Sequence, residues 1–307
     1  MTDLEREPTS RPACELTPGR LAEFACILEV TARKPGNVHR ELDLQGLHLL
    51  DFLLSAGAIV EPLNRSRELG LGQTVLEAVE ATRRVVQTNT NLGTILLLAP
   101  LCAVGDTEEL FSGAARVVAA AGIEDARKVY RAIRLAHPGG MGRVARQDLS
   151  EEPTVPLQEA MSLAKERDMI ARQYDNGFQE LRDEALPELK RHLDEGQPLE
   201  TAIQATFLRL LANHPDSLIV RKFGIDLAAE VSRRAGEILA AGWPSAGRSP
   251  NPLPAFDAWL RRRQRPLNPG TTADLIAATL FVALREGLLR LPRLPGSASW
   301  SRQGEEP

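Results

Sequence analysis

The sequence is poor in aromatic residues and has no surplus of basic charge. Aromatics make up only 4% of the 307 residues, whereas leucine and alanine are abundant. This bias favours helices packed on helices over strands. The formal net charge of -4 offers no general attraction to nucleic acid, whose binding proteins usually carry a basic surface. We therefore expect a helical protein that does not bind nucleic acid.

Cysteine is scarce, and long hydrophobic runs are missing. Cys14, Cys26 and Cys102 are widely spaced and form no CxxC pair, which argues against a disulfide framework or a zinc site and favours a reducing compartment. Residues 1–20 are polar and acidic, unlike a signal peptide. The longest apolar stretch, Thr94 to Val104, is shorter than the about 20 residues that span a membrane. These features predict a cytoplasmic protein without a membrane partner.

Period-2 apolar alternation is also absent beyond a few residues, whereas helical spacing recurs along the chain. We predict an all-α fold, with buried apolar helices around a polar cleft in one domain over residues 16–290. Residues 1–15 are expected to be a disordered tail, and residues 291–307 a flexible one. Helices are expected at 16–31, 47–62, 74–87, 108–121, 124–135, 157–175, 176–192, 198–212, 224–240 and 272–287. A further apolar helix is expected to begin at Asn91 or Thr90, with a kink or a new start at Pro100, and a short helix is expected to end at Arg263. The segment 216–223 is expected to be short and mixed.

Four polar segments adjoin strongly apolar helices: KPGN at 34–37, NTNLG at 89–93, DSLIVRK at 216–222 and NPGTTAD at 268–274. Glycine lets a backbone approach a ligand closely, and a helix N-terminus offers free N–H groups to an anion. Partly buried carboxylates can hold Mg²⁺ or accept a proton. We interpret the four segments as parts of one pocket for a sugar that carries phosphates.

Each segment also has a structural explanation. Lys34-Pro-Gly is a common helix stop, and Asn89 and Asn91 are typical helix caps. Asp274 falls near a helix start, where an acidic side chain favours the dipole, and Asp216 follows a His-Pro pair as a turn residue would.

Taken in order, the four motifs resemble the triphosphoribosyl-dephospho-CoA synthase family. The resemblance runs from about Leu21 to Gly287 and includes the segments 51–56 and 152–160. It implies a helical, cytoplasmic pentosyltransferase that joins the ribose of ATP to the 2′-hydroxyl of dephospho-CoA and expels adenine. The triphosphate stays on the transferred sugar.

One motif departs from the family's pattern. The synthases carry NTHKG where this chain has Asn89-Thr-Asn-Leu-Gly93, so a His and a Lys are replaced by Asn91 and Leu92. The chain thus looks more like a branch found in archaea and methanopterin-using microbes. An alternative is phosphoribosyl transfer from phosphoribosyl pyrophosphate to a pterin precursor, which rests on analogy. Two further classes stay open: a Mg²⁺-dependent phosphohydrolase and a non-catalytic helical interaction protein. The oligomeric state is left undetermined.

The expected chemistry assigns roles to the motif residues. Departure of a leaving group from ribose C1′ builds positive charge on the sugar, as in glycoside cleavage. Glu29, Asp216 and Asp274 are predicted to bind Mg²⁺ or to act as the base. Lys34, Arg221 and Lys222 are predicted to bind phosphates. Carboxamides are predicted to contact ribose or phosphate oxygens, namely those of Asn37, Asn89, Asn91 and Asn268. Glycines are predicted to let the ligand come close to the backbone, namely Gly36, Gly93 and Gly270.

Overall fold

The computed structural model describes residues 16–139, 147–244 and 251–289, and in these ranges every regular element is a helix. Two isolated β-bridges, His39–Leu42 and Leu44–Leu47, do not extend into strands. The all-α prediction is confirmed. The elements are α1 (Pro18–Thr31), α2 (Leu49–Ala58), α3 (Val60–Asn64), α4 (Ser66–Leu69), α5 (Leu71–Val85), α6 (Leu92–Cys102), α7 (Leu110–Ala120), α8 (Ile123–Ala136), α9 (Leu157–Ser162), α10 (Met169–Asn176), the π-helix η1 (Leu181–Ala185), α11 (Leu186–Asp194), α12 (Leu199–Asn213), α13 (Ser217–Phe223), α14 (Ile225–Ala240), α15 (Leu253–Arg261) and α16 (Gly270–Arg285).

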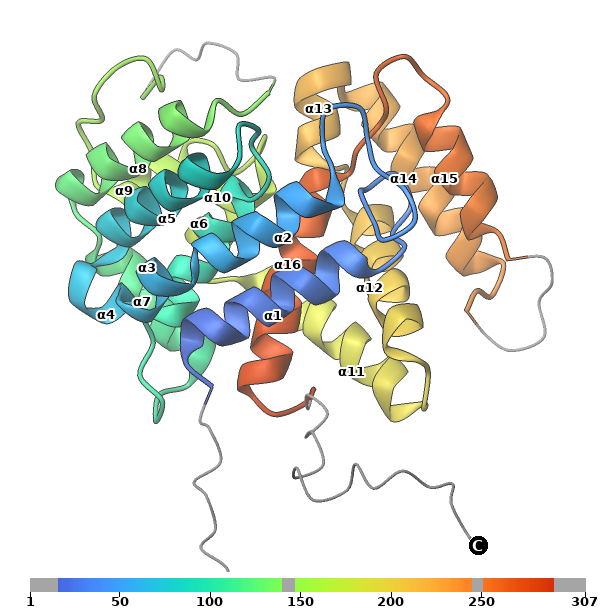
Figure 1. Ribbon diagram of the computed structural model, residues 1–307, viewed down its shortest axis with the longest axis horizontal. Helices are drawn as coiled ribbons and strands as arrows, with labels where there is room; N and C mark the ends of the chain where they lie inside the picture. Colours follow the sequence, from blue (N-terminus) through green and yellow to red (C-terminus); the bar gives the residue numbers. More distant parts are fainter. Residues whose placement is uncertain (1–15, 140–146, 245–250, 290–307) are drawn as a thin grey trace, which may run out of the picture.

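Two helices that are apolar on nearly every side form the centre of the molecule. In α6 every residue from Ile95 to Cys102 is buried, and in α16 so is every residue from Leu275 to Leu284. A helix without a polar face must be surrounded by other elements. Here α6 and α16 pack on each other, and α1 crosses both. Figure 1 shows α16 in the middle of the molecule, behind α1.

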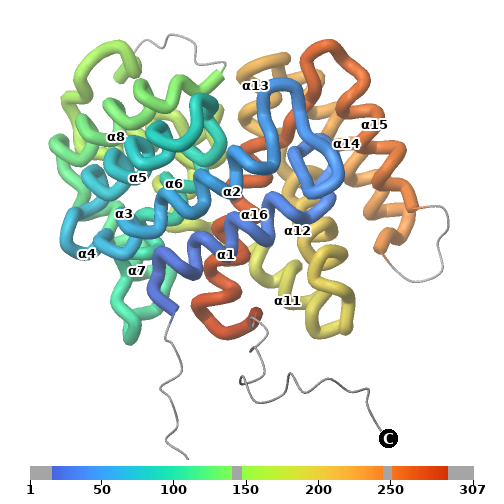
Figure 2. Tube along the Cα trace, viewed as in Figure 1, coloured from blue at the N-terminus to red at the C-terminus, as the bar shows by residue number. Residues whose placement is uncertain are grey.

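Amphipathic helices surround this centre in two groups. Helices α2 to α10 lie on one side of α16, and α11 to α15 lie on the other (Figures 1 and 2). On the first side α5 packs on α8, and on the second α12 packs on α14. The first and last helices of the described chain, α1 and α16, pack together between the groups. Segments far apart in the sequence therefore meet along the middle of the molecule.

Several predicted helices are interrupted, and each interruption has a local cause. The helix expected over 157–175 ends at Ser162 and restarts at Met169, because Asp168 accepts hydrogen bonds from the backbone of the new first turn. The one expected over 176–192 starts late, because Gly177 and Phe178 adopt positive φ after α10. The one expected over 47–62 is split at Ile59.

The segment expected to be short and mixed, 216–223, is the helix α13, and Asp216 is its N-cap. Pro100 lies inside α6 without ending it. In the described ranges no helix combines the length and the apolar character that crossing a bilayer would take. The predicted tails, 1–15 and 291–307, and most of the glycine-rich loop after His137 lie outside the described residues.

Candidate active site

A cavity of about 480 Å³ opens where the N-terminal ends of α6, α10 and α16 come together. Helices α1, α2, α8, α9 and α13 and the segments flanking the 140–146 gap complete its walls. Its size is within the range of pockets that hold small molecules. All four polar motifs contribute residues to it, from Asn37 near the start of the described chain to Asp274 near its end.

The N-termini of α6 and α16 supply part of the cavity wall. The residues 89–94 and 270–271 line it. Asn91 is the N-cap residue of α6, but its side chain makes no capping hydrogen bond. Instead, Oδ1 of Asn89 accepts a hydrogen bond from the backbone N–H of Leu92 at 3.2 Å. Helix N-termini carry partial positive charge and unpaired N–H groups, so two of them on one cavity favour an anionic ligand.

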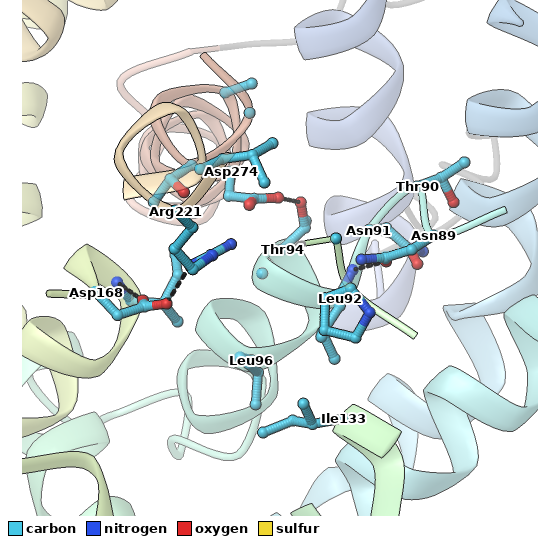
Figure 3. Close-up of a pocket in the computed structure, with 18 of the residues that line it drawn as sticks. Asn89, Thr90, Asn91, Leu92, Thr94, Leu96, Ile133, Asp168, Arg221 and Asp274 are labelled. Carbon is cyan, nitrogen blue, oxygen red and sulfur yellow. Dashed lines mark hydrogen bonds and ion pairs between the residues drawn. The ribbon is translucent and has the colours of Figure 1, made fainter. Parts of the chain in front are cut away.

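Asp274 is the central carboxyl group of the cavity. It lies in the second turn of α16, and its Oδ1 accepts a hydrogen bond from the hydroxyl of Thr94 at 2.6 Å. Burial, aided by the negative charges of Glu29 and Asp216 and opposed by the hydrogen bonds with Thr94, raises the pKa of Asp274 to about 8. The close approach of α6 requires glycine, because a Cβ on Gly93 would lie 2.1 Å from Asp274 Oδ2. Figure 3 shows Asp274 directed toward Thr94.

Glu29 is the second carboxyl group of the cavity wall, and Lys34 lies behind it. The ammonium of Lys34 is 3.0 Å from Glu29 Oε1, and it donates to the backbone carbonyls of Glu29 and Ala32 at the end of α1. Burial raises the pKa of Glu29, and the adjacent Lys34 opposes that shift. With an exposed fraction of 0%, Lys34 does not line the cavity. This position does not support the predicted contact of Lys34 with phosphate, because all three of its N–H donors are used to hold Glu29 and to end α1.

Asp216 is also placed behind the wall, contrary to its predicted role as a metal ligand or base. Its Oδ1 accepts from the backbone N–H groups of Leu218 and Ile219, at 2.9 and 3.1 Å. Its Oδ2 accepts from the N–H and the hydroxyl of Thr272, both at 2.8 Å. Burial raises the pKa of Asp216, and the Thr272 bonds oppose the shift. Asp216 thus joins the starts of α13 and α16, and the four hydrogen bonds leave its oxygens no free place for a ligand.

The three predicted metal ligands do not assemble into a metal site. Within the described ranges, no three or more His, Cys, Asp or Glu side chains are grouped as they would need to be to hold an ion. Glu29 and Asp274 share the cavity, but Asp216 does not reach it. Two carboxyl groups without a third are better suited to proton transfer than to a protein-built metal cage.

The predicted carboxamides lie at the cavity, and two of them pair with each other. Asn37 Nδ2 donates to Asn268 Oδ1 at 2.7 Å and to the carbonyl of Pro269 at 3.3 Å. Asn37, Asn89, Asn91 and Asn268 all line the cavity, as do Gly93 and Gly270. Gly36 does not line it. That glycine is needed for its turn instead, because its φ is +81° and a Cβ would lie 2.8 Å from the carbonyl of Leu267.

Basic side chains gather where α13 faces α10. Arg221 and Lys222 line the cavity as predicted, and Arg221 forms an ion pair of 2.5 Å with Asp168. Lys222 lies at the exposed rim. Desolvation of its ammonium lowers the pKa of Lys222, and the positive charges of Arg221 and Arg265 lower it further. A site that places cations together in this way favours a multiply charged anion.

The polar cavity residues that sequence reasoning missed include Cys26, Thr94, Arg167 and Asp168. Asp168 was hidden because it falls inside a helix predicted to be continuous. Cys26 lies one turn before Glu29 on α1, and burial followed by the charges of Glu29 and Asp274 raises the pKa of its thiol well above its ordinary value. A thiol in this state is neutral and a poor nucleophile.

The remaining wall is apolar. Leu92, Leu96 and Ile133 lie next to one another in Figure 3, below the Asp274–Thr94 pair, and all three line the cavity. The cavity thus combines a cationic side, two neighbouring carboxyl groups and an apolar wall. A helical fold with such a cavity fits the class of enzymes whose substrates carry phosphates.

The chain belongs to the ATP:dephospho-CoA triphosphoribosyl transferase family, whose model matches residues 15–292. A Vibrio cholerae protein named "Probable 2-(5''-triphosphoribosyl)-3'-dephosphocoenzyme-A synthase" is 28% identical over 296 residues, which covers 86% of each chain. A 2-(5''-triphosphoribosyl)-3'-dephosphocoenzyme-A synthase of Pectobacterium atrosepticum is 35% identical over 104 residues, or 34% of this chain and 32% of that protein.

A crystal structure from Archaeoglobus fulgidus, described as that of a "putative triphosphoribosyl-dephospho-coA synthase", has the same fold. Its TM-score is 0.59 at 24% identity, and the match covers 76% of this chain and 99% of the other. These comparisons confirm the predicted family and, with it, the enzyme class, a pentosyltransferase.

Proposed function

We propose that this chain transfers the 5-triphosphoribosyl group of ATP to the 2′-hydroxyl of 3′-dephospho-CoA and releases adenine, and that it does so in the cavity around Asp274. Family membership supports the reaction. The single structural observation that carries the site is the pair of carboxyl groups, Glu29 and Asp274, between helix N-termini and a cationic wall. Pentosyl transfer needs each of these parts.

The triphosphate of ATP would lie against the cationic side. Arg221 and Lys222 line it, and the N-terminus of α16 adjoins it. Charge-assisted hydrogen bonds from such groups contribute about 1.5–3 kcal/mol each. The phosphates would thereby fix the ribose with its C1′ near Asp274, and the carboxamides of Asn37 and Asn268 would contact ribose oxygens.

The two carboxyl groups would divide the proton transfers. Cleavage of the bond between C1′ and the adenine nitrogen requires a proton on the departing base, and formation of the C1′–O2′ bond releases one from the acceptor. Asp274, with its pKa near 8, holds a proton at neutral pH and would donate it to adenine. Glu29, whose negative charge is stabilised by Lys34, would accept the acceptor's proton and stabilise the positive charge that develops on the ribose.

Magnesium enters this proposal as part of the donor. Mg²⁺ keeps several waters and is usually held by one or two carboxylates together with substrate phosphates, and no larger set of protein ligands is assembled in the described ranges. We therefore expect the enzyme to use Mg·ATP, with the ion neutralising phosphate charge.

The test is adenine release from ATP, followed by chromatography with and without dephospho-CoA. Adenine that forms only with the acceptor, together with a product carrying the added triphosphoribosyl mass, supports the proposal. Release of inorganic phosphate without an acceptor would instead identify a phosphohydrolase, and the proposal would be abandoned.

A second donor–acceptor pair involves the same bond chemistry: phosphoribosyl pyrophosphate with a pterin precursor. The observation that favours it is the wall formed by Leu92, Leu96 and Ile133, since Leu92 stands where the resembled synthases have lysine. An apolar wall suits a flat heterocyclic acceptor better than an anionic one. Pyrophosphate release that depends on the pterin precursor, without adenine release from ATP, would favour this pair.

A further inference from the structure

Asp168 uses its two carboxylate oxygens for different purposes. Oδ1 accepts hydrogen bonds from the backbone N–H groups of Ile170 and Ala171, at 2.8 and 3.3 Å, and so caps α10. Oδ2 accepts from a terminal nitrogen of Arg221 on α13, at 2.5 Å. Figure 3 shows the two side chains meeting at the cavity. A residue that fixes a helix start and a cation at once couples the position of the cation to the backbone.

The bond to Asp168 orients the guanidinium without using up its donors. Guanidinium has five N–H donors in a rigid plane. One of them is held by Asp168, Nε is buried without a partner, and the other terminal nitrogen has no partner within the described ranges. Arg221 therefore lies at the cavity in a fixed plane, with donors free for a ligand.

Two further cations, Arg167 and Lys222, line the cavity close to this pair, and in the described part of the chain neither forms an ion pair. Carboxylates are also near, because Asp148 lines the cavity and the buried Asp216 lies within electrostatic reach of Arg221 and Lys222. The Asp168–Arg221 pair is partly buried, and the desolvation of such a pair offsets its attraction, so stability alone is a weak reason for it. A chain of phosphates, by contrast, would use the N–H donors that the protein leaves without partners.

We propose that Arg167, Arg221 and Lys222 form the subsite for the donor's phosphate chain, and that Asp168 is the positioning residue that holds Arg221 in the plane that contacts it. This inference rests on the proposed function for the nature of the ligand. The binding step can nevertheless be measured without group transfer.

The sign of one effect separates positioning from simple electrostatics. Removing a carboxylate from beside a phosphate subsite relieves repulsion, which by itself would tighten the binding of an anion. Loss of orientation weakens binding instead, because Arg221 must then be ordered by the ligand. Asp168→Ser is the informative change, since serine also caps helices well but is too short to hold Arg221.

The experiment measures the Kd of inorganic tripolyphosphate and of ATP by calorimetry for the full chain. We expect Asp168→Ser to raise both Kd values about tenfold and to raise the KM for ATP, with kcat changed less than twofold. In an Arg221→Ala background, which itself binds more weakly, Asp168→Ser should have no further effect. Glu109→Ser is the matched control, because Glu109 caps α7 through Phe111 and Ser112 and does not line the cavity.

Tighter or unchanged binding in Asp168→Ser overturns the inference, and so does an equal loss in the Arg221→Ala background. If the serine variant does not fold, Asp168→Asn replaces it. Asparagine keeps one oxygen for the cap and presents an amide to Arg221, so the same weakening is expected. Coupled tripolyphosphate binding without adenine release would refute the proposed function alone, whereas adenine release without coupling between Asp168 and Arg221 would refute this inference alone.

Discussion

The substitution Asp274→Asn separates the stability of this protein from its chemistry. Asparagine has nearly the same size as aspartate, and its Oδ1 can still accept the hydrogen bond from Thr94 that is 2.6 Å long in the native chain. The change removes only the ability to hold and release a proton. We expect the variant to fold more stably and to lose activity.

The expected gain in stability follows from the pKa of Asp274. In the unfolded chain this carboxyl ionises near its ordinary pKa of 3.8, whereas the folded chain keeps the proton until about pH 8. The folded state therefore binds one more proton between these values, and stability falls as the pH rises through that window. At pH 7 the loss is about 4 kcal/mol, from 1.36 kcal/mol for each pH unit above the unfolded pKa. Asparagine never ionises, so it escapes this loss.

Urea unfolding at pH 5, 7 and 9 measures the difference. The variant should exceed the native protein most at pH 9 and least at pH 5. Adenine release should fall at least 100-fold, the lower range for removal of a general acid. Asp226→Asn is the control, because Asp226 is an exposed residue in the first turn of α14. Its loss should change stability by at most about 1 kcal/mol and leave activity intact.

Two results would refute the reasoning. Native activity in Asp274→Asn would exclude proton transfer by this residue. A pH-independent difference in stability between variant and native protein would show that Asp274 is ionised in the fold, and the assignment of acid and base would have to be revised.

Three further predictions follow from the same contacts. Lys34→Met should lower the free energy of unfolding by about 3–5 kcal/mol in urea, because it leaves Glu29 buried without its partner; a loss below 1 kcal/mol would contradict the ion pair. Gly93→Ala should reduce adenine release more than tenfold while the protein still folds by circular dichroism, because its Cβ would displace Asp274; native activity would argue against that displacement. Hydrogen bonds from Arg40 and Arg33 lower the pKa of Glu200 to about 2, so these contacts stabilise the fold above about pH 4.5 and cease to do so as the pH falls toward 2. Glu200→Gln should therefore lower the free energy of unfolding by about 1–2 kcal/mol at pH 7 and by almost nothing at pH 2. An equal loss at both pH values would contradict the shift.

The all-helical fold could be predicted from local pattern, because helix formation depends on residues three and four apart. The buried character of α16 was evident from apolar residues on every side. The starts of helices were harder. Asp168 and Asp216 begin helices by accepting backbone hydrogen bonds, and an aspartate in the middle of a periodic stretch gives little sign that it does so.

The sequence by itself determined the class of fold, the family and the four segments that contribute to the cavity, since these depend on motifs whose members are close in the chain. Only the tertiary structure decided which side chains reach the cavity. Lys34 and Asp216 are charged residues next to glycine or proline, as several residues of the cavity wall are. Packing nevertheless turns both side chains inward, where the donors of Lys34 and the acceptors of Asp216 are all used by the protein. Burial is set by contacts between α1, α13 and α16, which lie far apart in the chain, so no local pattern could reveal it. The same contacts bury Asp274 and bring Glu29 within its electrostatic reach, and both effects raise the pKa of Asp274.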